Sequence, residues 1–345
     1  LLRVVVLGKT DLEEFPKSLL YMPNANNSLS HEAAFLLGLN AIKQNNTKLA
    51  GQFFVIAQTK AYYQSDKDKS LFWQFLATKD INALQKVAGS QDINIYSLYA
   101  KEELNATVEN IELLTQKSKK KVKFDMQDPF AWANLLDKIK DSNETELQKI
   151  ADTYNTKDTL PVYAFIKERQ AKYKQGYYIT PYSEYLKDVN TTRKILIYSI
   201  ARQESRFIPS AISTSYALGM MQFMPFLARD TAKQLKLKDF DIDYMFKPEI
   251  AYSFANHHLD YLEKYLNHPL FVSYAYNGGI GFTRRMLESG LFKKGDFEPF
   301  LSMELVAYNE SREYGKKVMA NYIVYSKLLG EKVSIKNLFE ELVQP

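Results

Sequence analysis

Apolar residues recur at three- and four-residue spacing from about Ser30 to Lys174, and strand signals are almost absent over this stretch. Each short segment can therefore form an amphipathic helix that buries one stripe of side chains. Helices of this kind need neighbours to cover those stripes. The pattern thus favours an α-solenoid, a superhelical array of helical hairpins, although no strict sequence period accompanies it.

Two helix starts support this interpretation. Ser30 can cap one helix, and Asp128 precedes Pro129 at the first position of another. The apolar stripe of the second helix is predicted to contain Phe130, Trp132, Leu135, Leu136 and Ile139. The helical pattern then breaks between Gly176 and Pro181. We therefore predict a helical arm over residues 1–176 and a second domain over residues 177–345.

Composition removes several classes of function. The 45 basic and 40 acidic residues leave a net charge of only +5, which is too small for a dedicated nucleic-acid binder. Cysteine is absent, so disulfides and thiolate metal sites are excluded. No run approaches the roughly 20 apolar residues of a spanning helix, and residues 1–7 are too short for a signal core. The basic run from Lys117 to Lys123 is best interpreted as a solvated loop, with contact to an anionic polymer as the alternative.

A helix predicted from about Thr192 to Phe207 carries Glu204 in its last turn, and Pro209 stops it. Partial burial at such a helix end would raise the pKa of the Glu204 carboxyl and keep it protonated near neutral pH, as a general acid requires. Taken alone, a glutamate beside Arg206 is more often a solvated helix residue. The motifs that follow favour the catalytic interpretation.

Four motifs occur in order along the second half of the chain: Glu204-Ser205, Gly219-Met220-Met221-Gln222-Phe223-Met224-Pro225, Ala275-Tyr276-Asn277-Gly278-Gly279 and Glu310-Ser311-Arg312-Glu313-Tyr314. Together they resemble the signature of the soluble lytic murein transglycosylases, which share the goose-type lysozyme-like fold. The resemblance covers about Tyr178 to Gly330, and the first half resembles more loosely the superhelical arm of the family's large members. It implies an all-α protein in which the arm precedes a lysozyme-like α-helical catalytic domain.

The resemblance also implies residue roles. Glu204 would be the sole catalytic acid and base. Ser213 and Gln222 would hold the sugar, Met224 and Tyr276 would form cleft walls, and Asn277 and Tyr314 would line or brace the cleft. Sugars present hydroxyl edges and apolar faces, which suits a few polar groups on aromatic and sulfur-bearing walls. Met220 is better explained as a core residue, Met221 can also be one, and Asn277-Gly278-Gly279 can also be a helix-end turn.

The sequence departs from the family pattern at four positions. Tyr216 and Gly278 stand where the family usually has Gly and Ala, and Ser311 and Gly315 stand where it has Thr and Val. None of these changes removes a group that the chemistry needs. Tyr216 can narrow the cleft near Ser213, so the pose of the substrate is the property in question.

Metal and nucleotide sites are not predicted. Asp239-x-Asp241-x-Asp243 lacks the glycine and the final glutamate of a calcium loop, and the adjacent His257 and His258 point apart on a helix. No phosphate-binding glycine loop is present. We therefore expect no cofactor and no metal.

Ordinary glycosidases use two carboxylates, whereas the resemblance implies that Glu204 acts alone on peptidoglycan glycan strands. It would cleave the bond between N-acetylmuramic acid and N-acetylglucosamine and leave 1,6-anhydro ends. Murein lies outside the inner membrane, so the resemblance implies a periplasmic monomer, with other cell-wall enzymes as further candidate partners. Two alternatives stay open: a lysozyme-type hydrolase whose second carboxylate is Asp230, Asp239 or Glu310, and a cell-wall-binding scaffold with a vestigial enzyme domain.

Overall fold

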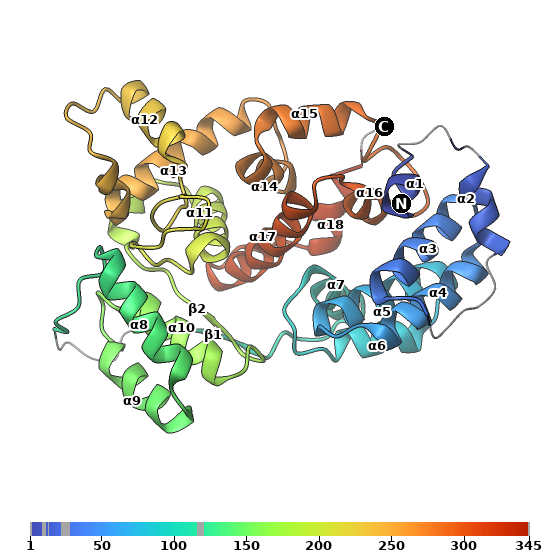
Figure 1. Cartoon of the computed structure of the whole chain (residues 1–345), viewed down its shortest axis with the longest axis horizontal. Helices are drawn as coiled ribbons and strands as arrows, with labels where there is room; N and C mark the ends of the chain where they lie inside the picture. Colours follow the sequence, from blue (N-terminus) through green and yellow to red (C-terminus); the bar gives the residue numbers. More distant parts are fainter. Residues whose placement is uncertain (1, 9–11, 13, 22–27, 116–120, 344–345) are drawn as a thin grey trace. The chain divides into compact units, whose positions relative to one another are not determined.

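The computed structural model of the chain describes residues 2–8, 12, 14–21, 28–115 and 121–343 (Figure 1). Helices dominate this part of the chain. Its two strands, β1 (Ile111–Leu113) and β2 (Gly176–Tyr178), pair in parallel with Ile111 opposite Gly176. The predicted all-α class is therefore confirmed. Residues 117–120 of the predicted basic run lie outside the described residues.

No helix in the described ranges combines the length and the apolar character that a bilayer crossing requires.

The chain divides into two compact units, and neither unit is one continuous segment. Unit 1 contains residues 1–108, 281–316 and 334–345. Unit 2 contains residues 109–280 and 317–333. The boundary predicted after residue 176 divides the chain differently, and it stays a prediction. Strand β2, at that boundary, belongs to unit 2 and pairs there with β1.

Unit 1 is built from helices near both ends of the chain. Its elements are α1 (Leu2–Val6), α2 (Phe15–Ser18), η1 (Leu19–Tyr21), α3 (His31–Lys43), α4 (Thr47–Lys60), α5 (Gln64–Thr78), α6 (Ile81–Ala88), α7 (Ile95–Glu103), α15 (Ile280–Glu288, from Gly281), α16 (Phe300–Leu305), the first part of α17 (Asn309–Leu328) and α18 (Ile335–Glu340).

Helices α3, α4 and α5 pack in chain order, as expected for a helical array (Figure 1). Ser30 caps α3 as predicted, and its Oγ accepts a hydrogen bond of 3.2 Å from the backbone N–H of Ala33. The rings of Phe35, Phe54 and Trp73 meet between these helices, with the Phe54 and Trp73 centroids 5.7 Å apart. A Cβ at Gly38 would lie only 2.4 Å from the Phe54 ring, so this close approach of α3 to α4 requires glycine.

The segment 281–316 packs into the same unit as the N-terminal helices. Phe300 on α16 lies 4.7 Å, centroid to centroid, from Phe72 on α5. The buried Glu304 carboxylate accepts a 2.8 Å hydrogen bond from Lys316 and a short one from the Tyr96 hydroxyl. Residues more than 200 positions apart therefore share one core, which a division at residue 176 would separate.

Unit 2 contains the middle of the chain. Its elements are β1, α8 (Pro129–Asp141), α9 (Glu144–Tyr154), α10 (Leu160–Gln170), β2, η2 (Ser183–Leu186), α11 (Thr191–Ser205), α12 (Pro225–Gln234), η3 (Ile242–Phe246), α13 (Pro248–Glu263), α14 (Pro269–Gly278) and the last part of α17.

The core of unit 2 is rich in tyrosine. Tyr198, Tyr252 and Tyr325 are fully buried, and the Tyr198 and Tyr325 rings lie 5.6 Å apart. The Tyr325 hydroxyl donates to the carbonyl of Ile179 at 2.8 Å, and the Tyr252 hydroxyl donates to that of Pro181 at 3.2 Å. The hydroxyls of Tyr252 and Tyr325 are thus satisfied by the chain segment that enters the second half of the protein.

Helix α8 begins as predicted, but one residue of its predicted apolar stripe is exposed instead of buried. Asp128 caps the helix by accepting a 2.9 Å hydrogen bond from the N–H of Phe130, and Trp132 and Leu135 are buried. Phe130, in contrast, is 80% exposed, so its assignment to the buried stripe is wrong. In the first turn of the helix its side chain lies on the face that α8 does not bury.

Candidate active site

Glu204 is the penultimate residue of α11, and its side chain is half-buried. The helix buries Ile195, Leu196 and Ile200 along one side and ends at Ser205, two residues earlier than predicted. It ends there because Arg206 and Phe207 both adopt left-handed backbone angles, with φ of 54° and 66°. Pro209 therefore lies beyond a helix that has already ended.

Two arginines hold this end of α11 in place. Arg202 and Arg206, one turn apart, both donate short hydrogen bonds to the carboxylate of Glu168 on α10, which is 3% exposed. Arg202 also donates to the carbonyl of Tyr177 at 2.7 Å and stacks 3.9 Å from the Tyr178 ring centroid. The buried Glu168 carboxylate thus uses both of its oxygens to fix the helix end that carries Glu204.

A compact hairpin over residues 211–223 follows the helix. Ile212 pairs with Leu218, and Leu218 pairs with Phe223, in antiparallel bridges. Gly219 has a φ of +74°, and a Cβ at this position would lie 2.1 Å from the carbonyl oxygen of Met245. Both conditions require glycine, which explains the first residue of the Gly219–Pro225 motif.

The predicted polar residues of this hairpin stabilise its backbone. The Ser213 Oγ accepts hydrogen bonds from the N–H groups of Ala217 at 2.9 Å and Ser215 at 3.2 Å. The Gln222 Nε2 donates to the carbonyls of Gly219 at 2.8 Å and Ala211 at 3.2 Å. Their roles in holding a sugar stay predictions.

The methionines of the motif differ in burial. Met220 and Met221 are completely buried, as expected for core residues, and the carbonyl of Met220 accepts a 2.8 Å hydrogen bond from Ser205. Met224 is half-buried and is the residue that precedes α12. Its role as a cleft wall is still a prediction.

Tyr276 on α14 lies within electrostatic range of the candidate acid. Its hydroxyl donates to the carbonyl of Met221 at 2.8 Å. Burial raises the pKa of this hydroxyl well above its usual range, and the nearby Glu204 carboxylate raises it further. Tyr276 is therefore a neutral hydroxyl within electrostatic reach of Glu204, and it connects α11, the hairpin and α14.

The remaining predicted residues lie at element ends or in the other unit. Asn277 is half-buried in the last turn of α14, and Gly279, with a φ of 86°, forms the helix-end turn that was one of the two predicted roles. Tyr314 is buried on the part of α17 that belongs to unit 1. Within unit 2, the structure thus brings Glu204 and Tyr276 together with the hairpin.

The candidates for a second carboxylate are surface residues. Asp230 is exposed on α12 and accepts a 2.7 Å hydrogen bond from Gln234 one turn away, which is an ordinary helix pair. Asp239 and Glu310 are also exposed. Asp241 caps η3 by accepting a 2.9 Å hydrogen bond from the N–H of Asp243. In the acidic run Asp239-x-Asp241-x-Asp243, this residue thus has a structural role.

His257 and His258 lie on α13, and His258 is close to Tyr276. No cluster of three or more histidines and acids with metal-binding geometry occurs within the described ranges. His258 packs against Tyr276 at 5.6 Å between ring centroids, and burial lowers its pKa to about 4. It is therefore a neutral ring in the wall behind Tyr276.

The sequence did not predict that Glu168 binds Arg202 and Arg206 at the end of α11. The spacing of Arg202 and Arg206 by four residues was the available signal, because it places both cations on one face of the helix end. Their common acceptor lies more than 30 positions earlier in the chain, on α10. No local pattern identifies such a partner.

Residues 182–296 match the family model described as the transglycosylase SLT domain. The soluble lytic murein transglycosylase of Salmonella typhimurium is 27% identical over 212 residues, which are 59% of this chain and 32% of that protein. The chain thus spans about a third of the length of the curated relatives that it matches.

Two solved structures share the fold. The 70 kDa soluble lytic transglycosylase of Escherichia coli matches with a TM-score of 0.65 and 18% identity, over 92% of this chain and 56% of that one. An inactive mutant of lytic transglycosylase Slt from Pseudomonas aeruginosa matches with a TM-score of 0.63 and 17% identity, over 97% and 58%. The family resemblance and the fold class predicted from the motifs are confirmed.

Proposed function

From the premise that this chain carries a transglycosylase SLT domain and has soluble lytic murein transglycosylases as relatives, we propose that it is a lytic transglycosylase of peptidoglycan. Its substrate is the bond between N-acetylmuramic acid and N-acetylglucosamine in the glycan strand, and its product carries a 1,6-anhydro end. Glu204 is the general acid and then the general base. Because murein lies outside the inner membrane, the proposed site of action is the periplasm.

The observation that carries this proposal is the arrangement of Glu204 and Tyr276. The Glu204 carboxylate lies at the end of a helix anchored by Glu168, and its charge helps to raise the pKa of the Tyr276 hydroxyl. A single acid on an anchored helix end, within electrostatic range of a neutral hydroxyl, suits a reaction in which one residue must both give and take a proton.

The proposed chemistry is balanced in two steps. Glu204 first donates its proton to the glycosidic oxygen, and the bond from that oxygen to C1 of the muramyl sugar breaks. The N-acetyl group of the substrate assists at C1, which removes the need for a second protein carboxylate. The Glu204 carboxylate then takes the proton of the C6 hydroxyl, and O6 bonds to C1. The acid is regenerated and no water is consumed.

The hairpin and α14 supply the proposed substrate contacts. Gln222 donates its Nε2 to two backbone carbonyls, so its Oε1 is the atom proposed to accept from a sugar hydroxyl. Ser213 lies on the same hairpin and is proposed as a second polar contact. The other proposed contacts are Met224, Tyr276, Asn277 and Tyr314.

The decisive experiment is mass spectrometry of the products of purified murein treated with the wild type and with Glu204→Gln. The substitution keeps the shape of the side chain and removes its transferable proton. We expect anhydromuramyl products from the wild type and a loss of at least about 10²-fold in rate in the variant, as for removal of a general acid. A thermal melt should show that the variant is as stable as the wild type.

Other outcomes discriminate between the alternatives. Products with reducing ends, heavier by one water, would identify a hydrolase and would direct attention to Asp230, Asp239 and Glu310 as second carboxylates. Sedimentation of the chain with murein and no products from the wild type would identify a binding scaffold.

A further inference from the structure

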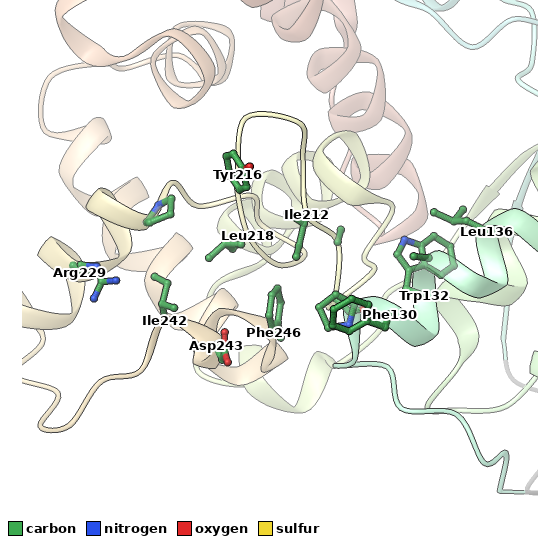
Figure 2. A pocket seen from close by; sticks show the side chains of 15 residues that line it. Phe130, Trp132, Leu136, Ile212, Tyr216, Leu218, Arg229, Ile242, Asp243 and Phe246 are labelled. Atoms are coloured by element: carbon green, nitrogen blue, oxygen red, sulfur yellow. The ribbon is translucent and has the colours of Figure 1, made fainter.

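A pocket of ≈ 750 Å³ opens between α8, the hairpin 211–223, α12 and η3, all within unit 2 (Figure 2). Its lining does not include Glu204, Gln222, Tyr276 or Asn277, so it is a different hollow from the candidate active site. Its volume lies inside the range of roughly 300–1,000 Å³ that is typical of ligand sites. We refer to it as the α8 pocket.

Aromatic side chains form much of its wall. Figure 2 shows Phe130 and Trp132 on α8, Tyr216 on the hairpin and Phe246 on η3. Phe130 is 80% exposed and Tyr216 is 74% exposed, whereas Trp132 is buried. Two large aromatic rings thus lie exposed at the surface around the pocket, where they have no role in the core.

Tyr216 occupies its position at a conformational cost. Its φ is +64°, in the left-handed region that an aromatic residue rarely adopts. Because the ring is mostly exposed, its burial contributes little free energy to offset this backbone strain. A strained backbone that presents an exposed aromatic side chain is typical of a binding surface.

Three polar groups line the same pocket. Arg229 and Asp243 are exposed, and neither forms a salt bridge with any described residue. Ser210 is 1% exposed, and its Oγ has no hydrogen-bond partner within the part of the chain that the structure describes. A buried hydroxyl without a partner is unfavourable, and a ligand hydroxyl would satisfy it.

This combination identifies the class of ligand. A lipid or an apolar peptide would leave the cation, the carboxylate and the buried hydroxyl unsatisfied. A sugar ring offers an apolar face to aromatic rings and hydroxyl groups to carboxylate and hydroxyl partners. A sugar that also carries a carboxylate would pair with Arg229, whose planar guanidinium binds carboxylates with two parallel hydrogen bonds.

We propose that the α8 pocket is an accessory site for a carboxylate-bearing sugar of the glycan strand. This proposal rests on the proposed function, because it takes the muramyl sugar as the source of that carboxylate. Phe130 and Tyr216 stack on the sugar, Arg229 pairs with its carboxylate, and Asp243 and Ser210 bind hydroxyl groups. The pocket thus holds the strand at a second point.

The pocket and the candidate active site share the hairpin. Ala211, Ile212 and Leu218 line the pocket, and the carbonyl of Ala211 accepts the hydrogen bond of Gln222. A ligand in the pocket therefore contacts Ala211, one of the two residues whose carbonyls hold Gln222.

Tryptophan fluorescence tests the proposal directly. The chain has only two tryptophans, and Trp73 is buried in unit 1, so Trp132 is the reporter. The protein is the full chain with Glu204→Gln, so that the probe is not consumed. The probe is a soluble tetrasaccharide of alternating N-acetylglucosamine and N-acetylmuramic acid. We expect a saturable change in emission that is lost when Trp132→Phe is added.

Two variants address the ligand contacts. Arg229→Gln should raise the Kd about tenfold, because a charge-assisted pair is lost. Tyr216→Gly should raise it by a similar factor while the protein stays at least as stable, because glycine relieves the left-handed strain as it removes the ring. Phe226→Ala and Lys233→Gln are matched controls on α12; neither residue lines the pocket, and both variants should bind like the parent.

Three results would overturn the proposal. The first is no change in Trp132 emission from a protein that still sediments with murein. The second is equal affinity in the pocket variants and the controls. The third is equal affinity for neutral chitotetraose, which would show that the pocket does not recognise the carboxylate of the sugar. Failure of the proposed function is distinguishable, since the wild type would then neither cleave murein nor sediment with it.

Discussion

At the scale of single residues, Gly219 and Gln222 explain the backbone conformation of the hairpin that follows α11. Gly219 satisfies both a positive φ and a close approach to the carbonyl of Met245, and Gln222, itself at a φ of +50°, ties the loop together through two hydrogen bonds. In the structure both residues stabilise the backbone of the loop, and the role of Gln222 in binding a sugar stays a prediction.

Gly219→Ala is expected to be strongly destabilising. Its left-handed backbone alone costs about 1–2 kcal/mol for a residue with a Cβ, and the contact of 2.1 Å with the Met245 carbonyl oxygen adds to this cost. Urea denaturation measures the effect. The matched control is Gly330→Ala in the same unit, where φ is +83° and no atom lies within 4 Å of the new Cβ. Equal losses in the two variants would contradict the proposed steric role of Gly219.

At the scale of elements, the important contact joins α10 to the end of α11. Glu168 is buried and binds Arg202 and Arg206, so that the helix turn with Glu204 is attached to an element from the predicted arm. Removing one partner of a buried ion pair is costly because the remaining charge loses its compensation. Through this contact, a residue outside the matched range 182–296 anchors the end of the helix that carries the candidate acid.

Glu168→Gln should therefore reduce both stability and murein cleavage. We expect a loss of about 3–5 kcal/mol in the free energy of unfolding, because the guanidinium of Arg202 stays buried without its carboxylate. Glu144→Gln, at an exposed position in the first turn of α9, should change stability by less than about 0.5 kcal/mol. Denaturation and product release are measured on the same samples. Full activity in a destabilised Glu168→Gln protein would show that this contact does not position Glu204.

At the scale of the whole molecule, both units are assembled from segments distant in sequence. The helices of residues 281–316 share a core with the N-terminal helices, and Glu168 lies before the predicted boundary but supports α11. A deletion of the predicted arm would thus remove parts of both units. It would expose Phe300 and leave Glu304 without its Tyr96 partner.

A fragment of residues 177–345 should consequently fail to fold cooperatively. We expect a broad thermal transition and strong binding of a hydrophobic dye, because the partners of its buried aromatic rings are missing. The full chain, purified in the same way, is the control. A fragment with a sharp transition and activity on murein would instead support the boundary predicted after residue 176.

One histidine in each unit has a shifted pKa, and the two shifts have opposite directions. In unit 1, a hydrogen bond to Asp66 raises the pKa of His31, and in unit 2, burial lowers the pKa of His258 to about 4. A raised pKa gives stability that is lost as the pH rises through it. A lowered pKa gives the opposite dependence: the stability present above the ordinary value near 6.5 is lost as the pH falls towards 4.

Unit 2 should therefore weaken between pH 6.5 and pH 4. The shift of His258 corresponds to about 3 kcal/mol at the acid end, since one pKa unit is worth ~1.4 kcal/mol. His258→Phe should remove most of this dependence, and His31→Phe should not. Hydrogen exchange of the Tyr276 region across this pH range provides the measurement. An unchanged slope in His258→Phe would assign the acid sensitivity to another group.

The sequence by itself determined the helical class, the candidate acid and the motif positions, because these depend on local periodicity, caps and residue order. Ser30 and Asp128 begin helices as predicted, and three of the four motifs lie within residues 182–296, which match the transglycosylase SLT domain model. Only the tertiary structure brought Tyr276 within electrostatic range of Glu204, attached Glu168 to the two arginines, exposed Phe130 in the α8 pocket and joined residues 281–316 to the N-terminal helices. These features depend on contacts between residues far apart in the chain, which local patterns do not encode.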